Sequence, residues 1–347
     1  MTTNPDQNKT TVLVTGGGGY VGSVLIPELI QNGYYVKCLD RFFFGKEFLS
    51  QENFQNNLEL IQDDIRWFDS KILKNVNIVL DLAALSNDPV GDLDPSKTSE
   101  INHKGRHRVA KLSKENGVDR YILASSASIY GQQENIATED SPVKPLTAYS
   151  KANRGAELDN LPLNDNDFTV TVLRFSSVYG VSPRMRFDTA VNNMVLDHFT
   201  KKEISVNGKD NKRPFVFTKD VVKSYLTTMS ASKDKISGEI FNVGSNEQNV
   251  TMEELANKIV DSINEPCKIS IADTNDHRSY FASFKKIEDV LGFTTDYTIQ
   301  DGAIEIYNAL KNNQISDNIK NKTVEWYKYL LKNPDVAKNL MINNNLL

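Results

Sequence analysis

The stretch Thr15-Gly16-Gly17-Gly18-Gly19-Tyr20-Val21-Gly22 stands between an apolar run at 11–15 and a segment of helical period. Its glycines are spaced as G-x-x-G-x-x-G, with Gly16, Gly19 and Gly22 at the key positions. In a turn from strand to helix, the first glycine permits the tight turn and the second lets backbone N–H groups approach a pyrophosphate. The third lets the helix pack on the strand. The stretch predicts a dinucleotide site contacted by Gly16, Gly19, Tyr20 and Val21.

The rest of the first half repeats this change from strand to helix. Runs rich in β-branched residues predict strands at 11–15, 35–40, 58–62, 77–82, 120–125 and 170–175. Segments of helical period separate most of them, which is the pattern of βαβ units. We therefore expect an α/β fold with a doubly wound (Rossmann) parallel sheet.

Beyond residue 180, proline and glycine punctuate shorter elements and indicate a smaller C-terminal α/β lobe. A Thr-x-x-Glu capping box, Thr251 and Glu254, predicts a helix over 251–263. We expect a dinucleotide-binding domain over 10–180, to which 215–245 returns. The substrate-binding lobe is then 181–214 with 246–311, followed by a helical tail over 312–347.

Asp40 closes the expected second strand, 18 residues after Gly22. An acidic side chain about 20 residues beyond the glycines accepts hydrogen bonds from the adenosine ribose and repels a 2′-phosphate. Asp40 therefore predicts NAD rather than NADP, although the adjacent Arg41 weakens that exclusion. The ends of the third and fourth strands should line the adenine and pyrophosphate through Asp64, Ile65, Leu82, Ala83 and Ala84.

Composition excludes several other classes of protein. A net charge of −5 argues against a nucleic-acid binder. Two cysteines give neither a disulfide framework nor metal-ligand spacing. No apolar run approaches the roughly 18 residues of a membrane span, and the polar start lacks a signal pattern, so we expect a cytoplasmic protein.

A pair of histidines, His103 and His107, has the i, i+4 spacing that could hold zinc on a helix. The neighbouring Lys104, Arg106 and Arg108 would repel a cation, and no third ligand accompanies the pair. A solvated basic helix face is the favoured interpretation, and no metal is expected.

Further segments follow the glycine stretch in a fixed order: Asn102, Ser125-Ser126-Ala127-Ser128-Ile129-Tyr130-Gly131, 149–157, Leu173-Arg174-Phe175, Val178-Tyr179-Gly180, Arg213-Pro214-Phe215 and Phe241-Asn242-Val243-Gly244. Over 11–308 the chain resembles the extended short-chain dehydrogenase/reductase superfamily, in its nucleotide-sugar epimerase/dehydratase branch. The resemblance implies NAD, a nucleoside-diphosphate sugar and a homodimer. It also adds Asn102 and Ser125 to the expected cofactor contacts.

The resemblance implies that Ser126 polarises the substrate oxygen and that Tyr149 is the acid/base for the hydroxyl being oxidised. A phenol, with an ordinary pKa near 10, must be made more acidic for this role. The family uses a lysine four residues on, whereas this chain has Asn153 there and Lys151 at the second position. Either Tyr149 and Asn153 hold the family positions, or Lys151 does and Thr147 replaces the tyrosine. The first register is preferred, because 145–149 and Glu157 then match without a gap.

Dehydratases of this family carry an Asp-Glu pair after the hydroxyl residue, where this chain has Ala127 and Ser128. Elimination of water would lack its acid and base, so 4,6-dehydration is disfavoured.

A diphosphate-linked substrate calls for arginines. The segment 181–188 with Asn192 and Asn193 resembles a subgroup that includes bacterial GDP-heptose C4 dehydrogenases. The expected substrate contacts are Ser86, Ser128, Arg184, Arg186, Asn192, Asn193, Arg213 and Arg278.

The sequence thus predicts an NAD-dependent epimerase or dehydrogenase that transfers a hydride at C4 of a nucleotide sugar. Retention of the cofactor would separate these two reactions. The alternative is a non-catalytic protein of the same fold that binds a dinucleotide or a nucleotide sugar, for which Asn153 is the argument.

Overall fold

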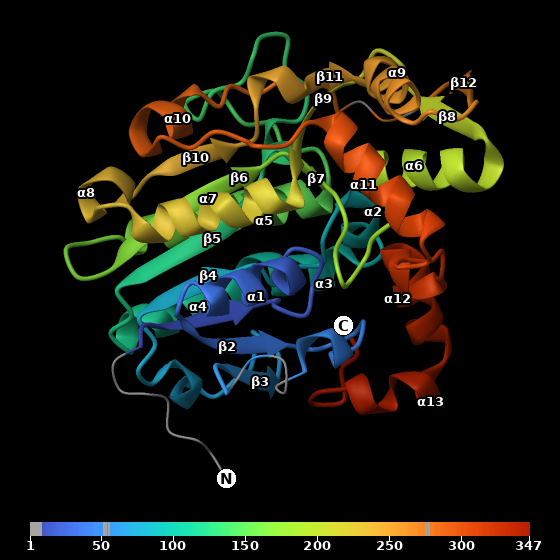
Figure 1. Ribbon diagram of the computed structural model, residues 1–347. Helices are drawn as coiled ribbons and strands as arrows, with labels where there is room; N and C mark the ends of the chain where they lie inside the picture. The colour runs from blue at the N-terminus through green and yellow to red at the C-terminus, as the bar shows by residue number, and fades with distance from the viewer. Residues whose placement is uncertain (1–8, 51–53, 55, 275, 277) are drawn as a thin grey trace.

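Seven parallel strands form the central sheet of the computed structural model, in the order β10-β6-β5-β4-β1-β2-β3 (Figure 1). The structure describes residues 9–50, 54, 56–274, 276 and 278–347. The strands are β1 (Thr11–Thr15), β2 (Tyr35–Asp40), β3 (Leu58–Gln62), β4 (Ile78–Asp81), β5 (Arg120–Ser126), β6 (Thr169–Phe175) and β10 (Ile240–Val243). All six predicted strands are present, with the fourth shorter at each end. The seventh, β10, pairs in parallel with β6.

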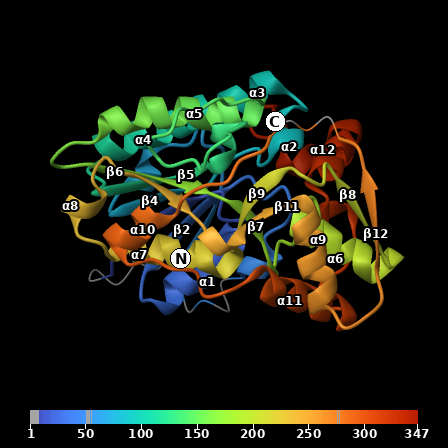
Figure 2. The same ribbon diagram turned by 90° about the horizontal axis from the view of Figure 1, so that it is seen from above.

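Helices cover both faces of this sheet, so that β1, β4 and β6 are buried along their whole length. Seen from above, α4 (Arg106–Glu115) and α5 (Ala148–Asn160) lie on one side, and α1 (Gly22–Gln31), α7 (Thr218–Ser230) and α10 (Lys285–Leu291) lie on the other (Figure 2). The strand order reverses at β1, which pairs with β4 on one side and β2 on the other. In doubly wound sheets, such a reversal opens a crevice at the carboxyl ends of the strands.

Two small sheets build the second lobe. One contains β7 (Ser177–Tyr179), β9 (Lys212–Phe217) and β11 (Asn249–Thr251), and the other β8 (Glu203–Asn207) and β12 (Lys268–Ala272). The lobe's helices are α6 (Ala190–Lys201), α9 (Met252–Ser262) and α11 (Ile299–Lys311). The predicted capping box opens α9, since Thr251 accepts from the Glu254 N–H and Glu254 accepts in return. The predicted boundary at 215 is wrong, because it cuts β9, whose partners are β7 and β11.

The remaining short helices are α2 (Asp88–Gly91), α3 (Pro95–Ser99), α8 (Lys233–Ile236) and a π-helical turn at Glu100–Gly105. The tail contains α12 (Thr323–Lys332) and α13 (Pro334–Ala337), which bring the C-terminus back towards the end of β2 (Figure 1). Within the described residues, no helix is both long enough and apolar enough to cross a membrane. Most of the polar start, residues 1–8, lies outside the described residues.

Candidate functional site

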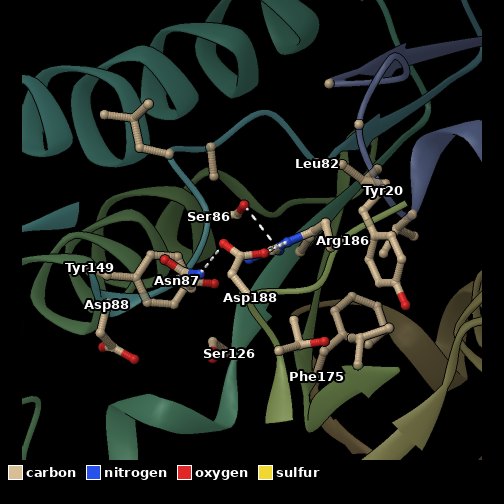
Figure 3. A pocket seen from close by; sticks show the side chains of 18 of the residues that line it. Tyr20, Leu82, Ser86, Asn87, Asp88, Ser126, Tyr149, Phe175, Arg186 and Asp188 are labelled. Atoms are coloured by element: carbon tan, nitrogen blue, oxygen red, sulfur yellow. Dashed lines mark hydrogen bonds and ion pairs between the residues drawn. The ribbon is translucent and has the colours of Figure 1, made fainter. Parts of the chain in front are cut away.

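A cavity of about 530 Å³ opens at the carboxyl ends of the central strands and extends beneath the second lobe. Its wall contains the glycine stretch, the ends of β2 to β5 and the start of α5. The second lobe contributes arginines and the tail contributes apolar side chains. Figure 3 shows Ser126 and Tyr149 on the same cavity as Ser86, Arg186 and Asp188.

The glycine turn is built as the sequence predicts. Gly16 has a positive φ of 69°, and a Cβ there would lie 2.7 Å from the Ala83 backbone nitrogen. A Cβ on Gly22 would lie 2.5 Å from Gly17 Cα. The turn therefore packs directly on the end of β4 and on its own helix, which leaves the backbone of Gly18 and Gly19 at the cavity wall.

Asp40 lies at the end of β2 on the cavity wall, where it is half-buried. One carboxylate oxygen accepts the Gly18 N–H at 2.9 Å and the other accepts the Phe42 N–H at 2.6 Å. Burial raises the pKa of Asp40, and the two N–H donors oppose that rise. The carboxylate is thus tied to the glycine turn.

Arg41, which could have bound the 2′-phosphate of NADP, is engaged by other partners. Its Nη1 pairs with Asp64 at 2.6 Å, and its Nη2 donates to the carbonyls of Leu340 and Asn345 in the tail. Because these partners occupy both ends of the guanidinium, a 2′-phosphate would have to displace them.

Most predicted cofactor and substrate residues lie on this one cavity: Gly16, Gly19, Tyr20, Val21, Asp40, Arg41, Asp64, Ile65, Leu82, Ala83, Ala84, Ser86, Ser125, Ser126, Ser128, Tyr149, Asn153, Arg184, Arg186, Arg213 and Arg278.

Three asparagines that were predicted to contact cofactor or substrate lie outside the described cavity wall and have protein partners instead. Asn102 is buried and bonds both the N–H and the carbonyl of Leu85, so it fixes the loop after β4. Asn192 is buried and bonds Gly180, Tyr20 and the Arg186 carbonyl. Asn193 is exposed and donates to Asp197. Two of the three hold the site from behind, because an amide can both donate and accept.

Ser126 and Tyr149 come from the end of β5 and the first turn of α5. Ser126 Oγ donates to Ser128 Oγ at 3.0 Å, and the two hydroxyls share the cavity wall. The Thr147 and Ser150 capping box begins α5, which places Tyr149 one residue inside the helix. A Cβ on Gly91 would lie 2.9 Å from Tyr149 Cβ, so α2 packs closely against this turn.

The two possible registers separate in the structure. Lys151 is exposed and lies with Thr147 and Asp92 in a different surface depression. Thr147 is committed to its capping bonds and to the Asp88 carboxylate. This placement favours the register with Tyr149 and Asn153 over the alternative with Lys151 and Thr147, because Lys151 lies outside the described cavity wall.

Asn153, one turn after Tyr149, is buried on the cavity wall. Its Nδ2 donates to the Tyr149 carbonyl at 3.1 Å, and its Oδ1 accepts from Arg106 Nη1 at 2.9 Å. Arg106 is 1% exposed, so it does not belong to the solvated basic face predicted for this helix. The two histidines beside it bond Asp159 and Asn160.

Arg184 is a buried cation with free donors. It is 4% exposed and lies over the Phe44 ring at 3.5 Å, and its Nη2 donates to Thr323. Within the described residues its Nε and Nη1 have no hydrogen-bond partner. Burial, followed by the nearby Arg186, lowers the pKa of Arg184 to about 9. A buried guanidinium with unused donors on a cavity wall fits an anionic ligand.

The other three arginines are each paired with a carboxylate on the wall. Arg186 pairs with Asp188 at 2.9 Å and donates to Ser86 (Figure 3). Arg213 pairs with Asp276 at 3.1 Å. Arg278 pairs with Asp276 and with Asp88. All three arginines line the cavity, and each carboxylate offsets part of the cost of burying its arginine.

The tail closes the cavity beside β2. Tyr327 packs edge-on against Phe43 and Phe44, with ring centroids 5.3 and 5.7 Å away. Trp326 Nε1 donates to the Phe43 carbonyl at 2.7 Å, and Leu347 lies on the wall. The sequence predicts only a helical tail over 312–347. It contains no signal for the place where that helix packs, so the part of the tail in the cavity wall was not predicted.

The cavity fits a dinucleotide. The glycine turn presents backbone where a side chain would intrude, Asp40 stands at the end of β2, and Arg184 offers free donors near the turn. Within the described residues, no group of three His, Cys, Asp or Glu side chains could hold a metal ion.

Comparison with known proteins places these features in a family. A putative UDP-glucose 4-epimerase of Methanocaldococcus jannaschii is 27% identical over 312 residues, which are 87% of this chain and 99% of that one. UDP-glucuronic acid decarboxylase 4 of Arabidopsis thaliana is 29% identical over 84% of this chain and 66% of its own length.

Solved structures are similar over most of the chain. MoeE5 in complex with UDP-glucuronic acid and NAD has a TM-score of 0.75 at 25% identity, over 92% of this chain and 99% of that one. The UDP-glucuronic acid 4-epimerase from Bacillus cereus, at 23% identity and a TM-score of 0.77, shares the fold. None of the relatives named here is a GDP-heptose enzyme, so that subgroup stays a prediction. Residues 12–244 match the NAD dependent epimerase/dehydratase family, and the chain belongs to that family.

Proposed function

We propose that this chain catalyses reversible, NAD-dependent oxidation at C4 of a nucleoside-diphosphate sugar. The observation that carries the proposal is the shared cavity: Ser126 and Tyr149 line the same cavity as the glycine turn and the arginines of the second lobe. A redox site needs the cofactor, the acid/base and the anionic substrate to meet in one place, and this cavity joins all three sets of residues.

The chain's residues divide the work. NAD, bound along the glycine turn, supplies the hydride acceptor. Tyr149 removes the proton from the sugar hydroxyl as the hydride leaves carbon, and Ser126 donates a hydrogen bond to the same oxygen. Arg186, Arg213 and Arg278 bind the substrate diphosphate and fix the sugar over Tyr149. Oxidation or epimerisation needs only these groups. Elimination would also need carboxylates beside Ser126, where Ala127 and Ser128 stand.

A panel of UDP-, GDP-, CDP- and dTDP-sugars tests the proposal. We expect a sugar-dependent change at 340 nm, or an epimerised product, with at least one of them. If every sugar binds and none changes in either way, the chain is the non-catalytic alternative.

The role of Asp40 gives a separate prediction about the cofactor. Asp40→Asn should weaken NAD binding by roughly 10- to 100-fold, because a hydrogen bond to a charged group contributes about 1.5–3 kcal/mol. NADP should not gain a corresponding advantage, since Asp64 and the tail hold Arg41. Titration calorimetry with both dinucleotides measures this, with Asp119→Asn, an exposed residue just before β5 and outside the cavity wall, as the matched control. Equal NAD affinity in the two variants would contradict the assignment.

A further inference from the structure

Arg106 is among the largest fully buried side chains of the described residues. It begins α4 directly after the π-helical turn, and its guanidinium lies on the cavity wall. Removing a cation from water is costly unless its surroundings repay the cost, and replacement of buried ion pairs by apolar groups is often neutral or stabilising. Stability alone therefore gives little reason to keep an arginine here.

The bonds of Arg106 connect three elements that meet under the site. Nη2 donates to the carbonyl of Asp81 at the end of β4, at 2.9 Å, and to that of Ala124 near the end of β5. Nη1 donates to Asn153 Oδ1, and Asn153 Nδ2 donates to the Tyr149 carbonyl. One guanidinium thus fixes the first turn of α5 against the ends of two strands.

Arg106 shares its carboxylate neighbour, Asp81, with two hydroxyls. Asp81 Oδ2 lies 3.6 Å from Arg106 Nε, and that nitrogen has no hydrogen-bond partner among the described residues. The Asp81 carboxylate accepts from Thr15 at 2.5 Å and from the Tyr121 hydroxyl. Within the described residues, the hydrogen bonds of the guanidinium therefore go to the two strand-end carbonyls and to Asn153.

We propose that Arg106 is a positioning residue for Tyr149: through Asn153 it fixes the acid/base turn against the ends of β4 and β5. This inference rests on the proposed function. It gives the uncharged Asn153 a role, since its amide accepts from Arg106 and donates to the Tyr149 carbonyl at the same time.

Other charged and titratable groups surround the two residues and must be held constant in any test. Those facing Tyr149 are Arg186 and Asp188 of the second lobe, Asp88 of α2, and Arg278 and Tyr280. Those facing Arg106 are Asp81, Tyr121 and Tyr225.

The test uses four full-length proteins: the natural chain, Arg106→Met, Asn153→Lys and the double variant. Arg106→Met should lower kcat by about 10- to 100-fold with KM little changed, because a displaced acid/base slows the chemical step without removing a substrate contact. Asn153→Lys alone should lose several degrees in melting temperature, because its ammonium meets the Arg106 guanidinium. The double variant should recover the melting temperature, since the like charges no longer meet, and should keep the low kcat, since the bonds to the two strand ends are still missing. Lys104→Met, an exposed cation two residues away, is the matched control.

Two results would overturn the inference. One is a folded Arg106→Met protein whose kcat matches that of Lys104→Met. The other is a loss of melting temperature in Asn153→Lys that the second substitution leaves unchanged. If Arg106→Met does not fold, Arg106→Lys replaces it: an ammonium lacks the guanidinium fork, so kcat should still fall at unchanged KM, and a natural kcat would refute the role of these bonds. The melting-temperature comparison needs no turnover, so it separates failure of this inference from failure of the proposed function.

Discussion

Tyr149→Phe is expected to lower kcat by about 10²- to 10⁴-fold, the usual contribution of a general acid/base. The substitution removes one hydroxyl from a residue of the cavity wall and leaves the backbone and Cβ of this turn packed against α2. NAD and sugar affinities should therefore change little, and kcat should carry the loss. Steady-state kinetics and titration calorimetry on the same preparation separate these quantities.

Tyr329→Phe is the control for that experiment, because Tyr329 is a half-exposed tyrosine of the tail, remote from the reacting groups. If Tyr149→Phe turns over at the natural rate, Tyr149 is not the base. The register that places Thr147 in that role would then return, although Thr147 is engaged with Ser150 and Asp88.

Truncation after Lys322 is expected to convert a retained cofactor into an exchanging one. The tail contacts the cofactor side of the cavity through Arg41, Phe43, Phe44 and Arg184. If it covers about 100 Å² of apolar ligand surface, it contributes roughly 2.5 kcal/mol, or about 70-fold in affinity. The full chain should keep NAD through gel filtration, and the truncated chain should lose it.

A point variant tests the same prediction if the truncated chain does not fold. Trp326→Ala removes a buried side chain that holds the tail to the Phe43 carbonyl. Leu331→Ala, on the exposed side of the same helix, is its control. NAD retention that is equal in all three variants would show that the tail does not hold the cofactor. Retention by the full chain favours the epimerase, which recycles its NAD, over the dehydrogenase.

The central sheet could be predicted because its signals are local. All six predicted strands match the structure to within one residue at each end, since runs such as 11–15 and 169–175 are buried along their whole length and rich in β-branched residues. The seventh strand, β10, has only four residues and pairs with β6, which ends more than 60 residues earlier. A pairing at that separation leaves no periodic signal in the sequence.

The sequence could predict which residues line the cavity where a motif at a strand end identifies them, as with the glycines, Asp40, Ser126 and Tyr149. It could not do so where burial and side-chain direction decide. Arg106 sits among basic residues on a helix, and only the packing of α4 against β4 and α5 shows that its side chain points inward. Lys151 is polar and close in sequence to Tyr149, yet the helix turns it outward.

The most direct test of C4 hydride transfer is an isotope experiment with a nucleotide sugar, chosen from the active members of the panel, that carries deuterium at C4. The account predicts a slower reaction with the labelled sugar. The deuterium should then be found either at C4 of the epimerised product or on the nicotinamide ring of the reduced cofactor, as mass spectrometry and NMR can establish. Deuterium lost to water, or a product formed while the label stays at an unreacted C4 with no effect on rate, would contradict it.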